Sequence, residues 1–118
     1  LHVVAPCRAA DTRTSGGPLA PFETRAFVVA GTCSVPASAY SAVLNVTAVS
    51  PAAPGALTLF PGHLPASPGT STVSFAPGRT RAVGTVMLLA ADGTGTLKVT
   101  NGSAGTVDVV LDVSGYFE

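Results

Sequence analysis

Short runs of alternating apolar and polar residues, each ended by glycine or proline, recur along the whole chain. In residues 107–113, valine and leucine at the odd positions alternate with Asp108 and Asp112. Side chains that alternate with a period of two lie on opposite faces of a β-strand. The longest stretch without glycine or proline, residues 37–50, is itself rich in β-branched residues. The chain is therefore predicted to be all-β.

Seven such runs are present, and an eighth strand is expected near Val3. They recur at intervals of roughly 8–14 residues with turn residues between them, a spacing typical of β-sandwiches and β-barrels. The length of 118 residues corresponds to one domain of ordinary size. We predict that residues 1–118 form a single antiparallel β-sandwich of about eight strands, similar to a jelly roll. The expected strands cover residues 27–30, 43–49, 57–60, 72–75, 83–89, 97–100 and 107–113.

A shift of 40 residues superimposes several positions of the chain on others. Ala42 then aligns with Ala82, and Leu57 aligns with Leu97. This similarity predicts two successive β-hairpins of one design, although alternating hairpins also resemble one another by chance. A third copy would indicate a β-trefoil, which is the alternative fold. Residues 2–41 do not align on the same positions, so the sandwich is preferred.

Turn and core positions follow from the same patterns. Asn101-Gly102 is the strongest two-residue turn signal, because Asn and Gly tolerate the positive φ angles that a tight hairpin requires. Four aromatic residues fall in strand patterns and are expected in the core: Phe22, Phe27, Phe60 and Phe75.

Charged side chains are few and balanced. Six basic and six acidic residues give a net charge of zero, and only 10% of the residues are charged. Scattered Lys and Arg residues do not form the basic face that nucleic-acid binding requires, so no nucleic-acid partner is expected. No run of about 18 apolar residues is present, so membrane insertion by a helix is not expected. Thr, Ser and Ala occupy the outward strand positions, which predicts a neutral surface rich in hydroxyl groups.

Two cysteines, Cys7 and Cys33, are present. In a chain with one Lys and many Thr, Ser, Gly and Pro residues, they indicate a disulfide formed in an oxidising compartment. Such a bridge would stabilise the fold by roughly 3.5 kcal/mol and tie the N-terminal strand to the next one. The alternative is a pair of buried thiols in a cytosolic protein.

Residues suited to catalysis are scarce. The chain has two histidines, His2 and His63, and no Gly-x-Ser-x-Gly nucleophile motif. A zinc site needs three or four His or Cys ligands at suitable spacing, and no phosphate-binding loop or dinucleotide-binding motif occurs. We therefore expect no enzymatic activity, no cofactor and no bound metal.

Asp11 and Arg13 form a charged cluster beside Arg8. They are interpreted either as a polar ligand clamp or as a pair that holds a turn by hydrogen bonds. Tyrosine rings bind sugars by stacking, and their hydroxyl groups favour contact with water or a partner. The candidate ligand-binding residues are Tyr40, Arg79, Arg81, Tyr116, Asp11 and Arg13.

Asp108 and Asp112 are expected on one face of the last strand, with Val110 between them. Two carboxylates could contribute to a calcium site, which needs six or more oxygen ligands. The alternative, and the preferred interpretation, is that both carboxylates simply lie on a solvated face.

Four segments, in this order, resemble a β-rich module of secreted and surface proteins from actinobacteria and other bacteria. They are DTR at 11–13, LNVTAV at 44–49, GALTLFP at 55–61 and DVSGYF at 112–117. The resemblance covers nearly the whole chain and implies an extracellular or cell-surface, non-catalytic module attached to other domains. Ala56 stands where such modules often have an aromatic residue, which weakens the expectation of a sugar-stacking site on that strand.

The leading functional hypothesis is a secreted accessory module that binds carbohydrate or cell-envelope polymer through a shallow polar surface. The alternative is a self-associating structural module, since near-zero net charge favours association between copies. A weaker third hypothesis is an inhibitor or receptor-binding domain that presents the loop at 61–70.

Overall fold

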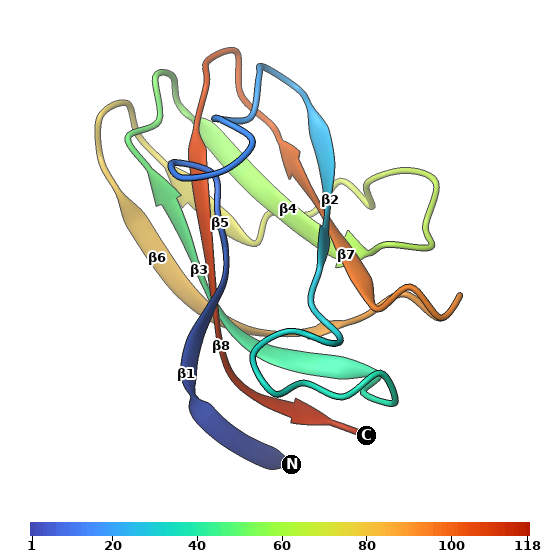
Figure 1. The fold of residues 1–118 in the computed structure, drawn as a ribbon. Helices are drawn as coiled ribbons and strands as arrows, with labels where there is room; N and C mark the ends of the chain where they lie inside the picture. Colours follow the sequence, from blue (N-terminus) through green and yellow to red (C-terminus); the bar gives the residue numbers. More distant parts are fainter.

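The computed structural model describes residues 1–118 and contains eight strands and no helix (Figure 1). Strong β-formers fill each strand, and Gly, Pro, Ser and Thr fill most of the connections between them. The strands are β1 (His2–Asp11), β2 (Thr24–Val28), β3 (Ser41–Val49), β4 (Gly55–Pro61), β5 (Val73–Phe75), β6 (Arg81–Leu88), β7 (Thr96–Asn101) and β8 (Asp108–Phe117). No helix that is long and apolar enough to cross a membrane is present.

The strands form two four-stranded sheets, with the orders β1-β8-β3-β6 and β2-β7-β4-β5. Every strand pair is antiparallel. Two packed antiparallel sheets confirm the predicted β-sandwich, and these strand orders match the eight-stranded jelly roll. The β-trefoil alternative is wrong.

The chain crosses from one sheet to the other after every strand except β4. Thus β3 and β4 lie in different sheets, as do β6 and β7, and the prediction of two repeated hairpins is wrong. The shared positions are also not equivalent in space. Ala42 is buried between the sheets, whereas Ala82 is exposed on the outer face of its strand. Val46, which is buried, likewise aligns with Val86, which is 57% exposed, so the 40-residue shift aligns the inner face of β3 with the outer face of β6.

The core lies between the two sheets and is built from the inward positions of β3, β4, β7 and β8. In β3, for example, Leu44 and Val46 are buried while Asn45 between them is exposed. Each fully buried Val or Leu side chain stabilises the fold by about 1.5–3 kcal/mol. The alternation read from the sequence therefore identifies the inner face of these strands correctly.

The four phenylalanines expected in the core have different positions. Phe75 is buried in the core, and Phe60 is buried on the outer face of β4, beneath the segment that follows the strand. That segment is held down by hydrogen bonds from Thr58 to the Thr70 carbonyl and from Lys98 to the Leu64 carbonyl.

Phe27 on β2 is half-buried and packs against the core, as predicted, at the edge of its sheet. Phe22, in contrast, corrects the prediction. Phe22 lies in the turn before β2, with φ of 59° and 69% of its surface exposed. Its neighbours Pro21 and Glu23 belong to the turn rather than to a strand, so no sheet face is available to cover the ring.

Asn101 is buried at the end of β7 instead of forming a hairpin turn. Its side-chain amide donates to the carbonyls of Ala20, at 2.9 Å, and Gly105, at 2.8 Å, and its Oδ1 accepts from the Ser103 hydroxyl at 2.7 Å. The predicted two-residue turn is wrong because β7 and β8 belong to different sheets. The Asn101 side chain instead joins the segment before β2 to the β7–β8 connection.

Candidate functional site

One groove is hollowed into the protein, with a volume of about 590 Å³. It lies between β1 and β2, which are edge strands of the two sheets. One wall is formed by residues 8–11 of β1 and the other by Phe27 of β2, while Thr14 and Ser15 of the β1–β2 connection lie at its end. The groove therefore combines one aromatic ring, small apolar side chains and several polar groups.

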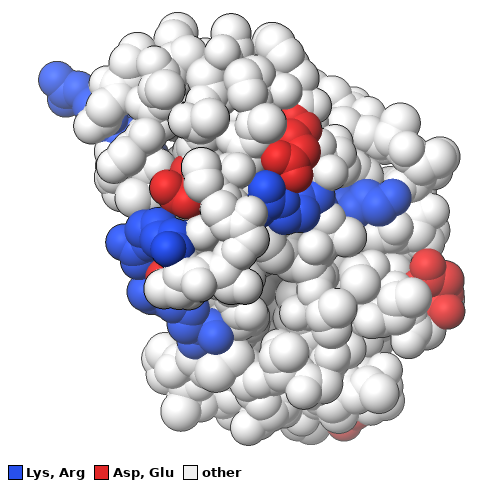
Figure 2. Space-filling model, turned by 45° about the horizontal axis from the view of Figure 1, so that its top comes forward, with Lys and Arg blue, Asp and Glu red and all other residues white.

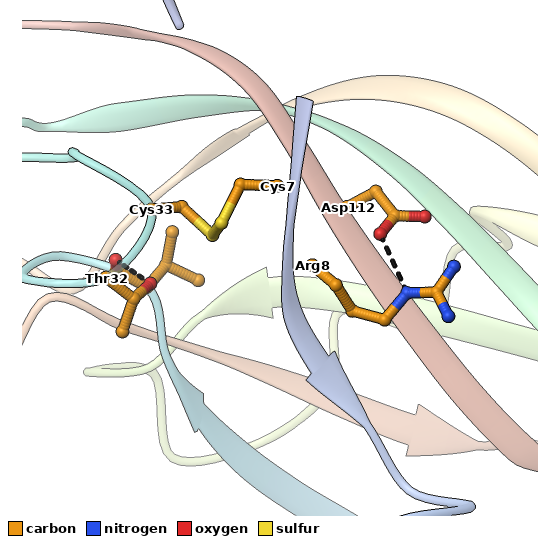
Figure 3. The surroundings of a disulfide bond; sticks show 6 residues. Cys7, Arg8, Thr32, Cys33 and Asp112 are labelled. Carbon is orange, nitrogen blue, oxygen red and sulfur yellow. Dashed lines mark hydrogen bonds and ion pairs between the residues drawn. A yellow bond between two sulfur atoms is a disulfide. The ribbon is translucent and has the colours of Figure 1, made fainter. Parts of the chain in front are cut away.

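A bulge in β1 sets the direction of the Arg8 side chain. Arg8 pairs with Asp112 and Ala10 with Leu111, so Ala9 is an extra residue on β1. A bulge of this kind bends a strand and turns its side chains. Figure 3 shows the side chains of Cys7 and Arg8 leaving β1 in opposite directions, Cys7 toward Cys33 and Arg8 toward Asp112.

Four charged residues, Arg8, Asp11, Arg13 and Asp112, form what we term the arginine cluster. Arg8 Nε donates to Asp112 Oδ1 at 3.0 Å, and Arg8 Nη1 donates to Asp11 Oδ2 at 3.3 Å. Arg13 Nε and Nη2 donate to the two oxygens of Asp11 at 3.0 and 2.9 Å, and the Arg13 backbone N–H donates to Asp11 Oδ1 at 3.0 Å. The prediction that Asp11 and Arg13 hold a turn together is confirmed.

Asp11 is the centre of the cluster, and its side chain is only 8% exposed. Hydrogen bonds from Arg13 hold the pKa of the Asp11 carboxyl at about 2, below its ordinary value of 3.8. The Arg8 and Arg13 side chains, in contrast, are about half exposed. The cluster thus exposes two guanidinium groups to solvent, and both of them bind the ionised carboxylate of Asp11.

Asp108 and Asp112 do share one face of β8, as predicted, and both accept hydrogen bonds from β1 or the residue after it. Thr12 Oγ1 donates to Asp108 Oδ1 at 2.7 Å, and Arg8 binds Asp112. No group of three or more His, Cys, Asp or Glu side chains is arranged so that it could hold a metal ion. The two carboxylates therefore bind neighbouring side chains of β1 and its turn.

The Cys7–Cys33 disulfide is present, as predicted. It joins β1 to the connection between β2 and β3, so it links the strand that carries Arg8 to the segment that follows the strand of Phe27. That segment is also held by the Thr32 hydroxyl, which donates to the Val29 carbonyl at 2.6 Å (Figure 3). The disulfide therefore connects the two walls of the groove.

The predicted ligand-binding residues fall in three places. Asp11 lines the groove and binds Arg13, which is not part of the lining. Tyr40 and Tyr116 lie at the end of the sandwich where the chain termini meet (Figure 1). Tyr40 is 54% exposed; the half-buried ring of Tyr116 stacks against His2 with 4.8 Å between ring centroids.

Arg79 and Arg81 are exposed at the start of β6, far from both tyrosines. The register places Arg81 opposite Ala48 and Leu88 opposite Ser41, the residue after Tyr40. This separation of seven residues along a strand corresponds to about 23 Å. The six residues therefore do not form one binding surface.

Four groove residues with a polar or aromatic side chain are missing from the predicted set: Arg8, Thr14, Ser15 and Phe27. Phe27 is expected in the core, which it does contact, and nothing in its strand pattern shows that β2 is a sheet edge. Arg8 is noted beside Asp11 and Arg13, but its bond to Asp112, 104 residues away, cannot be read from the sequence.

No protein-family model matches this chain, and comparison with curated proteins finds no match. The resemblance to modules of bacterial surface proteins therefore stays a prediction.

Proposed function

We propose that this chain is a non-catalytic accessory module, acting outside the cell, that binds carbohydrate or cell-envelope polymer in the groove between β1 and β2. The observation that carries the proposal is the composition of this one groove. It places the ring of Phe27 beside the polar groups of Arg8, Asp11, Thr14 and Ser15.

This composition suits a sugar. The C–H face of a pyranose ring packs against an aromatic side chain, and its hydroxyl groups need partners that donate and accept hydrogen bonds. Arg8 supplies N–H donors, and the Ser15 hydroxyl supplies a donor and acceptors. The Thr14 hydroxyl donates to the Asp11 carbonyl and supplies acceptors. Arg8 is already held in place by Asp11 and Asp112, so it loses less side-chain freedom when a ligand binds.

Two further features support the proposal. The Cys7–Cys33 disulfide is of a kind that persists in oxidising compartments, which supports an extracellular location. On the face that Figure 2 shows, charged side chains occur in small separate groups on a mainly uncharged surface, which suits contact with a polymer of many hydroxyl groups.

A pull-down on insoluble chitin, cellulose and peptidoglycan tests the proposal. Retention of the wild-type protein on at least one polymer is expected, and both Arg8→Ala and Phe27→Ala should reduce it by about tenfold or more. Arg81→Ala is the matched control, because it removes an exposed arginine at the far edge of the same sheet. Retention on none of the polymers would refute the proposal.

A second candidate function, self-association, is favoured by β6. This strand forms one edge of its sheet, and its outer face carries Val86 and Leu88, which are 57% and 58% exposed. An exposed apolar edge strand is a template for pairing with another chain. Light scattering after size exclusion would show a dimer or larger assembly that Val86→Lys disrupts; a strict monomer at high concentration would exclude this candidate.

A further inference from the structure

The geometry points to an uncharged, hydroxyl-rich glycan as the ligand of the β1–β2 groove, and not to an anionic polymer. This inference rests on the proposed function and narrows its ligand class. It follows from three properties of the groove: the balance of its charges, the bonds that its arginines already make, and the size of the side chains around Phe27.

The charges of the arginine cluster cancel. Arg8 and Arg13 face Asp11 and Asp112, and all four are joined by ion pairs of 2.9 to 3.3 Å. The groove lining holds no lysine. Of the four residues only Arg8 and Asp11 line the groove, one of each charge, so an anionic polymer would gain little net attraction there.

The guanidinium charges are also already paired within the protein. Arg13 uses Nε and Nη2 on Asp11, and Arg8 uses Nε on Asp112 and Nη1 on Asp11. Each guanidinium keeps three of its five N–H donors, which can bind the oxygen of a sugar hydroxyl.

Small side chains line the groove beside the half-buried ring of Phe27. The β1 residues that line the groove with it are Ala9 and Ala10, whose methyl groups project little from the backbone. The Thr14 hydroxyl donates a hydrogen bond to the Asp11 carbonyl, so its oxygen lone pairs remain as acceptors. The side chain of Ser15 is exposed. A pyranose ring can thus lie on an apolar floor with hydroxyl partners around it.

The test compares neutral and acidic sugars on a glycan array and by titration calorimetry. The probes are cellohexaose and chitohexaose on one side and hexagalacturonate and poly(glycerol phosphate) on the other. We expect binding of a neutral probe whose affinity changes less than about twofold between roughly 20 mM and 500 mM NaCl, because no net charge is neutralised. No binding of the acidic probes is expected.

A charge variant sharpens the comparison. Asp112→Asn removes one carboxylate from the arginine cluster and leaves Arg8 with free charge, so it should add salt-sensitive binding of hexagalacturonate. Asp92→Asn is the matched control, because it changes the net charge by the same amount at an exposed turn outside the groove. Thermal unfolding of both variants verifies that they are folded.

The outcomes separate the two proposals. Salt-dependent binding of an acidic probe by the wild-type protein would overturn the neutral-ligand inference and leave carbohydrate binding intact. Binding of none of the array glycans would overturn both.

Discussion

Asp11 and Arg13, two residues apart, share three hydrogen bonds, one through the Arg13 backbone and two through its guanidinium group. This contact helps to close the turn after β1, beside the groove that Asp11 lines. Because it depends on an ionised carboxylate, the contact links the stability of the turn to pH.

The melting temperature should fall as Asp11 is protonated. The pKa of Asp11 is about 2 in the folded protein and 3.8 ordinarily. A lowered folded-state pKa contributes stability that is complete above the ordinary pKa and is lost as the pH falls toward 2. In Asp11→Asn, the melting temperature should be lower than wild type at neutral pH and should fall less between about pH 5 and about pH 2. An identical pH profile for both proteins would contradict this assignment.

Removing the disulfide should lower the free energy of unfolding by about 3–4 kcal/mol. The cross-link joins residues 26 positions apart and restricts the unfolded chain. Urea denaturation of the Cys7→Ser, Cys33→Ser double variant measures the loss, and reduced wild-type protein should match the variant. The free energy of unfolding of the double variant should not change when reductant is added. A change would show that the reductant acts on something other than this disulfide.

Asn101→Ala should lower the free energy of unfolding by about 2–3 kcal/mol, because it removes the hydrogen bonds that the buried Asn101 side chain makes to the Ala20 and Gly105 carbonyls and to the Ser103 hydroxyl. Asn45→Ala is the matched control, since Asn45 is exposed on the outer face of β3. Chemical denaturation of both variants checks the prediction. Equal stability of the two would show that the Asn101 contacts contribute nothing.

Gly55→Ala should destabilise the protein by about 1–3 kcal/mol. A methyl group at Gly55 would lie 2.5 Å from the Gly102 carbonyl oxygen and 2.5 Å from Ser103 Cβ. At Gly84 the nearest atom is 4.0 Å away, so Gly84→Ala should leave the melting temperature unchanged or raise it slightly. A larger loss at Gly84 than at Gly55 would contradict the close packing of the β4 and β7–β8 segments.

The sequence predicts the fold class well because alternation is local. The pattern at 107–113 shows which side chains of β8 face the core without knowledge of any other strand. Strand pairing is not local: Asp112 meets Arg8, 104 residues away, and only the sheet order brings them together. For that reason the hairpin prediction is wrong although every predicted strand overlaps an observed one, the strand at 27–30 by only two residues.

The site was predicted only in part for the same reason. Asp11 and Arg13 are neighbours in the sequence, so their contact could be foreseen. Phe27 lines the groove because β2 is a sheet edge, and Phe60 is buried on an outer face because the segment after β4 covers it. Both positions depend on the tertiary arrangement of the strands. The sequence pattern of an aromatic residue in a strand does not distinguish a groove residue from one that is covered by a neighbouring segment.

The central claim is that ligand binds in the groove between β1 and β2, and mapping by nuclear magnetic resonance tests it most directly. Titration with the neutral oligosaccharide that binds best on the array should shift the signals of Arg8, Thr14, Ser15 and the Phe27 ring. Signals of Tyr40 and of β6 should stay in place. Shifts centred on Tyr40 or on β6, with the groove signals unchanged, would contradict the account.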